Sequence, residues 1–144
     1  MFLLDTDYVV LMQRGPSAEL DRLLDRMAAY SDTDFYLPVV AFHEQMLGAN
    51  AYISRAKARR EIVRGYTMLH RVLTDFSDSQ VLPFDDAAAT TFDELRGRGV
   101  RVGTMDLRIA SIAKSKNLTV LTRNTVDFAS IPDLTVEDWT VRTT

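Results

Sequence analysis

The chain has 144 residues, 47% of them apolar and 26% charged, and 17 Lys and Arg against 20 Asp and Glu give a net charge of −3. This size and composition are those of one folded domain and exclude a disordered chain. The sequence has no cysteine and only two histidines, His43 and His70, so it excludes disulfides, thiolate nucleophiles and multi-histidine metal sites. Any metal would be held by oxygen atoms.

The first half of the chain predicts two strands, each followed by helical sequence. Phe2 to Leu4 predicts a buried strand, and Gly15-Pro16 then opens a helix whose apolar face holds Leu20, Leu23, Leu24 and Met27. Phe35 to Leu37 predicts the second strand. After it comes a long helical stretch, from Val39 to Asp75, which we expect to break near Gly48 to Ala51.

The second half predicts three more strands and two helices. The strands are Gln80 to Phe84, Leu118 to Leu121 and Leu134 to Val136. One helix is capped by Asp85 and ends at the Gly97 to Gly99 pair, and the other runs from about Thr104 to Lys116, with Asn117 as its stop. Strands that alternate with helices predict a parallel sheet of about five strands, covered on both faces. We therefore expect a single α/β domain over residues 1–144.

Acidic residues lie where a parallel sheet binds ligands. Asp5 directly follows the first strand, and Asp127 follows the fourth. Glu44 is in the early turns of the helix after the second strand, and Asp106 is in the first turn of the fourth helix. Right-handed crossovers bring such positions to one edge of the sheet, where open α/β folds bind ligands.

Each acid also has an ordinary explanation, because Asp5 suits a cap, Asp106 suits a helix N-terminus, and Glu44 suits an exposed helix face. As a group they repel one another unless a hard cation such as Mg²⁺ or Mn²⁺ lies among them. Two such metals held by carboxylates can activate water for in-line attack on a phosphodiester.

The Asp5-Thr6-Asp7 sequence leaves two further alternatives open. Asp7 shares the side of Asp5 if the backbone stays extended, and otherwise it is a solvated turn residue. The spacing also resembles the strand-end Asp-x-Asp of haloacid-dehalogenase-like phosphatases, in which Asp5 would be the nucleophile and Asp7 the general acid.

Several motifs together resemble the PIN-domain ribonucleases. They are Leu3-Leu4-Asp5-Thr6-Asp7, Glu44 with Gly48, Asp106-Leu107-Arg108-Ile109-Ala110, and the segment from Leu121 to Phe128. The segment from Ile131 to Trp139 resembles the ending of the VapC toxins of bacterial toxin–antitoxin pairs. The resemblance covers nearly the whole chain. It implies a PIN-like α/β fold and a Mg²⁺- or Mn²⁺-dependent endoribonuclease that acts as a toxin.

The resemblance also implies roles for individual residues. Asp5, Glu44 and Asp106 match the central acids that bind metal and carry catalysis, and Asp127 matches the more variable fourth. Thr6 and Asn124 would be supporting polar residues that help to bind substrate. The sequence departs from the family at Asp7, where Asn is usual, and at His43, where a small or apolar residue usually precedes the glutamate.

The partners implied by the resemblance are RNA, a small antitoxin protein and a second copy of the chain in a homodimer. Promoter DNA would be bound only through the antitoxin. No signal peptide or membrane span is visible, so we expect a cytoplasmic protein without membrane contact. A PIN nuclease that processes RNA outside a toxin pair, or a degenerate PIN domain that only binds, remains open.

Two groups of basic residues are candidates for binding RNA phosphates. Lys57, Arg60, Arg64 and Arg71 share one face of a predicted helix, which is either a phosphate-tracking ridge beside the acids or a solvated surface. Arg96, Arg98, Arg101 and Arg108 lead into the helix of Asp106, where Arg108 would hold a substrate phosphate or neutralise a carboxylate. We expect Trp139 to pack against a terminal strand.

Overall fold

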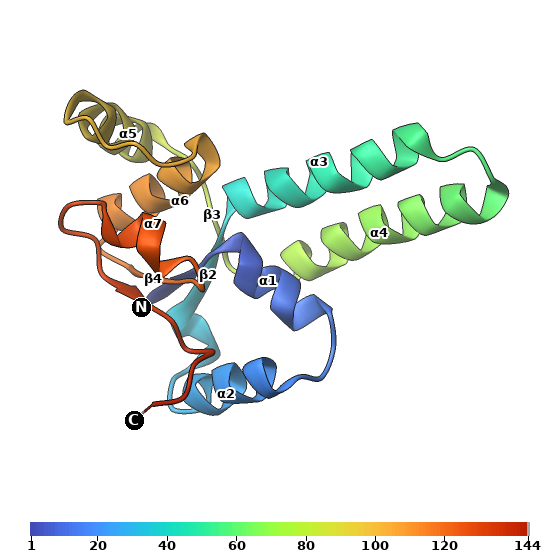
Figure 1. Ribbon diagram of the computed structural model, residues 1–144, viewed down its shortest axis with the longest axis horizontal. Helices are drawn as coiled ribbons and strands as arrows, with labels where there is room; N and C mark the ends of the chain where they lie inside the picture. The colour runs from blue at the N-terminus through green and yellow to red at the C-terminus, as the bar shows by residue number, and fades with distance from the viewer. Residues whose placement is uncertain (144) are drawn as a thin grey trace.

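The computed structural model describes residues 1–143, which form five strands and seven α-helices (Figure 1). A short 3₁₀ turn, Asp32–Asp34, precedes the second strand. In chain order the elements are β1 (Phe2–Leu4), α1 (Thr6–Gln13), α2 (Ala18–Met27), β2 (Phe35–Pro38), α3 (Val39–Arg55), α4 (Arg59–Ser77), β3 (Val81–Leu82), α5 (Asp86–Gly97), α6 (Thr104–Ser115), β4 (Thr119–Leu121), α7 (Thr125–Ala129) and β5 (Val136–Glu137).

The five strands form one parallel sheet in the order β3-β2-β1-β4-β5. The central strand is β1, in which Leu3 pairs with Tyr36 of β2 and with Val120 of β4. This arrangement confirms the predicted parallel α/β fold. It also brings the ends of β1, β2 and β4 to the same edge, because parallel strands all point one way.

The sheet separates two apolar clusters, and neighbouring residues of β1 belong to different ones. Leu3 packs in a cluster with α5 and α6, whereas Leu4 packs with α1, α2 and Trp139 on the other side. Successive side chains of a strand point to opposite faces, so a strand of three apolar residues supports both layers. Trp139 is 1% exposed and packs edge-on against Phe2, which confirms its structural role.

The structure decides between the alternatives for the segment after Asp5 in favour of a capping role for Asp5. This segment is not extended but forms α1, and the carboxylate of Asp5 caps this helix by accepting the N–H of Thr6. Tyr8 and Leu11 of α1 are buried, which stabilises the helix by packing although it has only 8 residues.

The predicted break near Gly48 to Ala51 is also wrong. α3 continues to Arg55, and the chain turns at residues 56–58 before α4 begins. A single glycine costs a helix about 1 kcal/mol, which is too little to end it when its neighbours pack well. Leu24, which the sequence placed on the apolar face of its helix, is 48% exposed.

Other boundaries agree closely with the sequence. Asp85 caps α5 by accepting the N–H of Ala88 at 3.0 Å. Asn117 follows α6 with a positive φ of 59°, in the left-handed conformation that commonly ends helices. The two outer strands, β3 and β5, have two residues each and are shorter than predicted.

The helices α3 and α4 pack against each other as a hairpin that extends away from the sheet (Figure 1). We call this hairpin the arm. Several apolar side chains of α4 are exposed, including Ile62, Tyr66 and Leu73. No helix within residues 1–143 combines the length and apolar character that a membrane span requires.

Candidate active site

Asp5 lies at the end of the central strand and is the most buried acid of the site. Its side chain is 5% exposed. One carboxylate oxygen accepts the N–H of Thr6 at 2.7 Å, and the other accepts the hydroxyl of Thr122 at 2.8 Å. Burial and then the nearby charge of Asp7 raise the pKa of Asp5 to about 7, from an ordinary value of 3.8.

A chain of hydrogen bonds leads from Asp5 to Asp127. The Thr122 hydroxyl, which donates to Asp5, accepts the N–H of Asn124 at 2.9 Å. The Asn124 amide in turn donates to Asp127 at 3.0 Å. Thr122 has no exposed surface, and the sequence reasoning gave it no role. Its signal was its position directly after β4, which matches the position of Asp5 after β1.

Glu44 reaches the site from the second turn of α3. Its Oε1 atom accepts the hydroxyl of Thr6 at 2.8 Å, so Thr6 contacts both Asp5, through its N–H, and Glu44. Thr6 begins α1, and this places the two acids on either side of the helix start. His43, the neighbour of Glu44, is exposed.

Asp106 completes the acidic edge from the first turn of α6. Burial raises the pKa of Asp106, and so do the charges of Glu44, Asp127 and Asp7. These acids are thus close enough to act on one another electrostatically. Among residues 1–143, however, no three acidic or histidine side chains are spaced as ligands of a single metal ion.

Asp7 is held by Arg123 and is not a solvated turn residue. Its Oδ2 accepts the backbone N–H of Arg123 at 3.0 Å and lies 3.7 Å from the Nε of that guanidinium. Arg123 also donates to Glu19 at 2.9 Å. The Oδ1 atom of Asp7 is buried without a partner among the described residues, and burial raises the pKa of this carboxyl.

The predicted basic residues do not lie among the acids. Arg108 is half-buried and its guanidinium contacts the sulfur of Met105, with no ion pair to Asp106 within residues 1–143. Residues two apart on a helix point about 200° away from each other, which separates these side chains. Lys57 lies in the turn between α3 and α4, and Arg60 and Arg64 are in the first two turns of α4, whereas Glu44 is about 16 Å back along α3 from its last residue, Arg55. Their contact with RNA stays a prediction.

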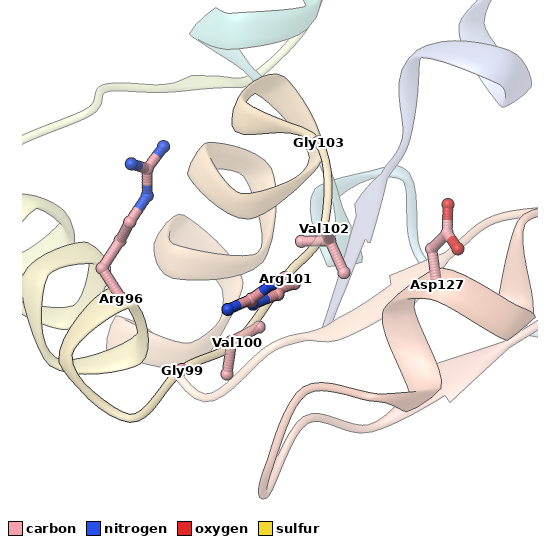
Figure 2. A pocket seen from close by; sticks show the side chains of 7 residues that line it. All are labelled: Arg96, Gly99, Val100, Arg101, Val102, Gly103 and Asp127. Carbon is pink, nitrogen blue, oxygen red and sulfur yellow. The ribbon is translucent and has the colours of Figure 1, made fainter.

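A hollow of about 630 Å³ opens beside Asp127. We call it the arginine hollow, and it is lined by Arg96, the segment from Gly99 to Gly103, and Asp127. Figure 2 shows Asp127 on one side and the two arginines, Arg96 and Arg101, on the other, with the guanidinium of Arg101 directed away from Asp127. The sequence placed these arginines in a basic group but did not predict a cavity.

A comparison with protein families matches residues 2–134 to the PIN domain. The chain belongs to the PIN-domain family. This PIN domain is 28% identical to Ribonuclease VapC of Rickettsia bellii, over 93% of this chain and 92% of that protein. It is 26% identical to Toxin FitB of Neisseria gonorrhoeae, over 96% and 99% of the two chains. Family membership decides against the phosphatase alternative for Asp5 and Asp7.

A third relative matches more strongly over a shorter region. The tRNA(fMet)-specific endonuclease VapC of Shigella flexneri is 40% identical over 63 residues, which are 41% of this chain. In that match the chain spans about half, 48%, of the relative's length.

Solved structures with the same fold include toxin–antitoxin complexes. DNA-bound VapBC from Salmonella typhimurium has a TM-score of 0.73 and 25% identity, over 96% of this chain and 97% of the other. FitAB bound to an IR36 DNA fragment has a TM-score of 0.72 and 25% identity, over 100% and 99% of the chains.

Proposed function

We propose that this PIN domain is a Mg²⁺- or Mn²⁺-dependent endoribonuclease that acts as the toxin of a toxin–antitoxin pair. The observation that carries the proposal is the acidic edge of the sheet. There Thr6 links Asp5 to Glu44, a chain of hydrogen bonds links Asp5 to Asp127, and Asp106 is near enough for its charge to act on Asp5. The pKa values of Asp5 and Asp106 are both raised, partly by neighbouring carboxylates. Perturbed acids that share one edge of an α/β sheet are typical of a catalytic site.

The donor chemistry of this site suits a hard divalent cation. All four acids offer carboxylate oxygens, which Mg²⁺ and Mn²⁺ prefer, and a cation would relieve the repulsion that raises the pKa values. Within residues 1–143 no three acids are spaced as ligands of one ion, and Glu44 and Asp127 accept hydrogen bonds from Thr6 and Asn124, so metal binding in this proposal requires these carboxylates to rearrange. When bound, the metal would supply activation of the attacking water and stabilisation of the charged phosphate.

The chain's own residues orient the acids. Thr122 and the N–H of Thr6 fix both oxygens of Asp5, which keeps this buried carboxylate in one rotamer. Asn124 donates to one oxygen of Asp127, which is exposed. Such hydrogen bonds to acidic ligands set their direction, so the threonines and the asparagine are positioning residues in this proposal. The relatives named ribonuclease or endonuclease support RNA as the substrate.

The proposed protein partner is a small antitoxin, and the complexes VapBC and FitAB among the structural neighbours support it. The arm offers a suitable surface. Phe42 and Met46 of α3, with Tyr66, Leu69 and Leu73 of α4, line an apolar hollow of about 520 Å³. Contiguous exposed apolar surface commonly marks a protein interface, which also fits the proposed homodimer. Promoter DNA would be bound through the antitoxin, and the pair would work in the cytoplasm.

The proposal is tested by cleavage of RNA by the purified protein with Mg²⁺, with Mn²⁺ or with a chelator. We expect cleavage with either metal and none with the chelator. Asp106→Asn should abolish cleavage, whereas Asp93→Asn, an exposed acid on α5, should cleave at the wild-type rate. Circular dichroism of each variant checks that the fold is intact. Cleavage in the chelator, or by Asp106→Asn at the wild-type rate, would overturn the metal-dependent mechanism.

Toxin action is tested separately in cells. Expression of the wild-type chain should stop bacterial growth, and co-expression of the protein encoded next to its gene should restore growth. Growth that is unaffected by an active nuclease would instead favour the RNA-processing alternative.

A further inference from the structure

Backbone hydrogen bonds shape one side of the arginine hollow. It is built on the loop between α5 and α6, in which Gly99 has a φ of +80°, a conformation that favours glycine. The N–H of Gly99 donates to the carbonyl of Arg96, and the N–H of Val100 donates to the carbonyl of Leu95, both at 3.1 Å. These bonds close the end of α5 and fix the start of the loop.

The same loop directs Arg101 outward. Val100 and Val102 on either side pack against the apolar cluster around α6. Val100 and Val102 are half-buried, so they anchor the loop and leave the side chain between them facing solvent. Arg101 is accordingly exposed. Its position is therefore set by packing, although its side chain is at the surface.

The two arginines of the hollow carry uncompensated charge. Within residues 1–143, neither Arg96 nor Arg101 forms an ion pair, whereas Arg26 and Arg123 lie against carboxylates. Arg96 lies over the ring of Phe92, 5.0 Å from its centre, and donates to the hydroxyl of Thr104 at 3.3 Å. These two contacts orient the guanidinium without neutralising it.

The hollow is continuous with the acidic edge, because Asp127 belongs to both. Asp127 lines the hollow, and its charge raises the pKa of Asp106. A ligand in the hollow would therefore lie next to the carboxylates. The two sides differ in the groups they attract, since guanidinium groups bind phosphate directly and carboxylates bind it only through a cation.

We infer that the arginine hollow binds a phosphate of the RNA strand next to the one that is cleaved. This inference rests on the proposed function and adds a substrate subsite to it. Arg96 and Arg101 donate to the oxygens of this neighbouring phosphate and so hold the strand in register with the acids. The contact is to the backbone, so it contributes affinity and orientation and leaves sequence recognition to other contacts.

The test is RNA binding by variants in an Asp106→Asn background, measured in chelator. The probe is a fluorescein-labelled RNA oligonucleotide, and the readout is fluorescence anisotropy at several salt concentrations. Arg96→Ala and Arg101→Ala should each weaken binding about three- to tenfold, because each removes a charge-assisted hydrogen bond partly screened by solvent. The double variant Arg96→Ala/Arg101→Ala should reduce the slope of log affinity against log salt by about 0.7, the value for one phosphate contact on a single strand, and each single variant should reduce it by less.

Arg98→Ala is the matched control. Arg98 is an exposed arginine of the same loop, unpaired within residues 1–143, but it does not line the hollow. Removing Arg98 changes the net charge by the same amount, and we expect the RNA affinity of this variant to stay within about twofold of that of the Asp106→Asn parent. In the active background, Arg101→Ala should raise KM and leave kcat nearly unchanged, as expected for a group that binds the strand away from the reacting atoms.

Two results would overturn the inference: equal effects of the Arg98 and Arg101 variants, or no RNA binding by the Asp106→Asn parent. Neither depends on catalysis. A wild-type protein that binds RNA through the hollow and cleaves nothing would refute the proposed nuclease and leave the subsite standing. A wild-type protein that cleaves RNA while its arginine variants bind RNA normally would refute the subsite and leave the proposed nuclease standing.

Discussion

Replacing Asp5 by asparagine should abolish RNA cleavage and, at neutral and higher pH, make the metal-free protein more stable. The physical reason is the cost of a buried charge. The pKa of Asp5 is raised to about 7 because the folded protein surrounds its carboxylate with apolar atoms and the like charge of Asp7. The unfolded chain has no such environment, so its carboxyl keeps the ordinary value near 3.8.

The magnitude follows from these two pKa values. Below about pH 4 the carboxyl is protonated in both states, and it contributes no dependence on pH. Between about pH 4 and pH 7 the folded protein binds more protons than the unfolded chain, so the free energy of unfolding falls as pH rises. A difference of about three units is worth about 4 kcal/mol in total, of which about 2 to 3 kcal/mol falls between pH 5 and pH 8.

Asparagine removes this dependence and keeps most of the local contacts. Its amide oxygen can accept the N–H of Thr6, and its amide nitrogen can donate to the hydroxyl of Thr122. Only the hydrogen bond with Thr122 then changes direction, because in the wild type that hydroxyl donates to Asp5. We therefore expect the stability difference between Asp5→Asn and wild type to grow in favour of the variant by about 2 to 3 kcal/mol from pH 5 to pH 8.

The assay is urea unfolding of both proteins in chelator at pH 5, 6, 7 and 8. RNA cleavage is measured in Mn²⁺ on separate aliquots of the same preparations. Asp93→Asn serves as the control, because this exposed acid on α5 should leave the pH dependence unchanged. A stability difference that is constant over this pH range would refute the raised pKa of the buried Asp5 carboxyl. Wild-type cleavage by Asp5→Asn would refute its place in the active site.

Two further predictions concern Asp7 and the arm. Asp7→Asn should keep RNA cleavage and reach half of the maximal rate at lower pH and lower Mn²⁺, because it removes a charge that raises the pKa of Asp5. A loss of activity as large as that of Asp5→Asn would instead make Asp7 a metal ligand. Gly65→Ala should lower the free energy of unfolding by about 1 to 3 kcal/mol, since its new methyl group would lie 2.6 Å from the Cγ1 atom of Ile53. Gly48→Ala, which meets nothing within 4 Å, should raise it by up to about 1 kcal/mol, and urea unfolding of the pair measures both.

The sequence was sufficient to predict those elements whose position is set by residues within one short segment. The apolar runs of β1, β2 and β4 were readable because a buried strand needs uninterrupted apolar residues. The ends of α5 and α6 were readable because Asp85 and Asn117 act on the backbone a few residues away. The positions of Asp5, Glu44 and Asp106 followed from the same rule, because each comes at or soon after a predicted element boundary.

Packing between distant segments overrode local preference elsewhere. The sequence left a helix capped by Asp5 as one alternative, but it could not establish α1, because this short helix is stabilised by burial of Tyr8 and Leu11 against other layers. The glycine at position 48 indicated a break, but α3 continues because it packs against α4, with Ile53 so near Gly65 that an added Cβ there would lie 2.6 Å from its Cγ1 atom.

The sequence by itself determined the fold class, the helix caps and the acidic residues that line one edge of the sheet. Only the tertiary structure decided how those acids are held, because the decisive contacts join residues far apart in the chain. Thr122 lies 117 residues from Asp5, and Arg123 lies 116 residues from Asp7. Whether such pairs meet depends on strand register and on the packing of loops, which local periodicity does not encode. The same reason explains why the arginine hollow became visible only in three dimensions.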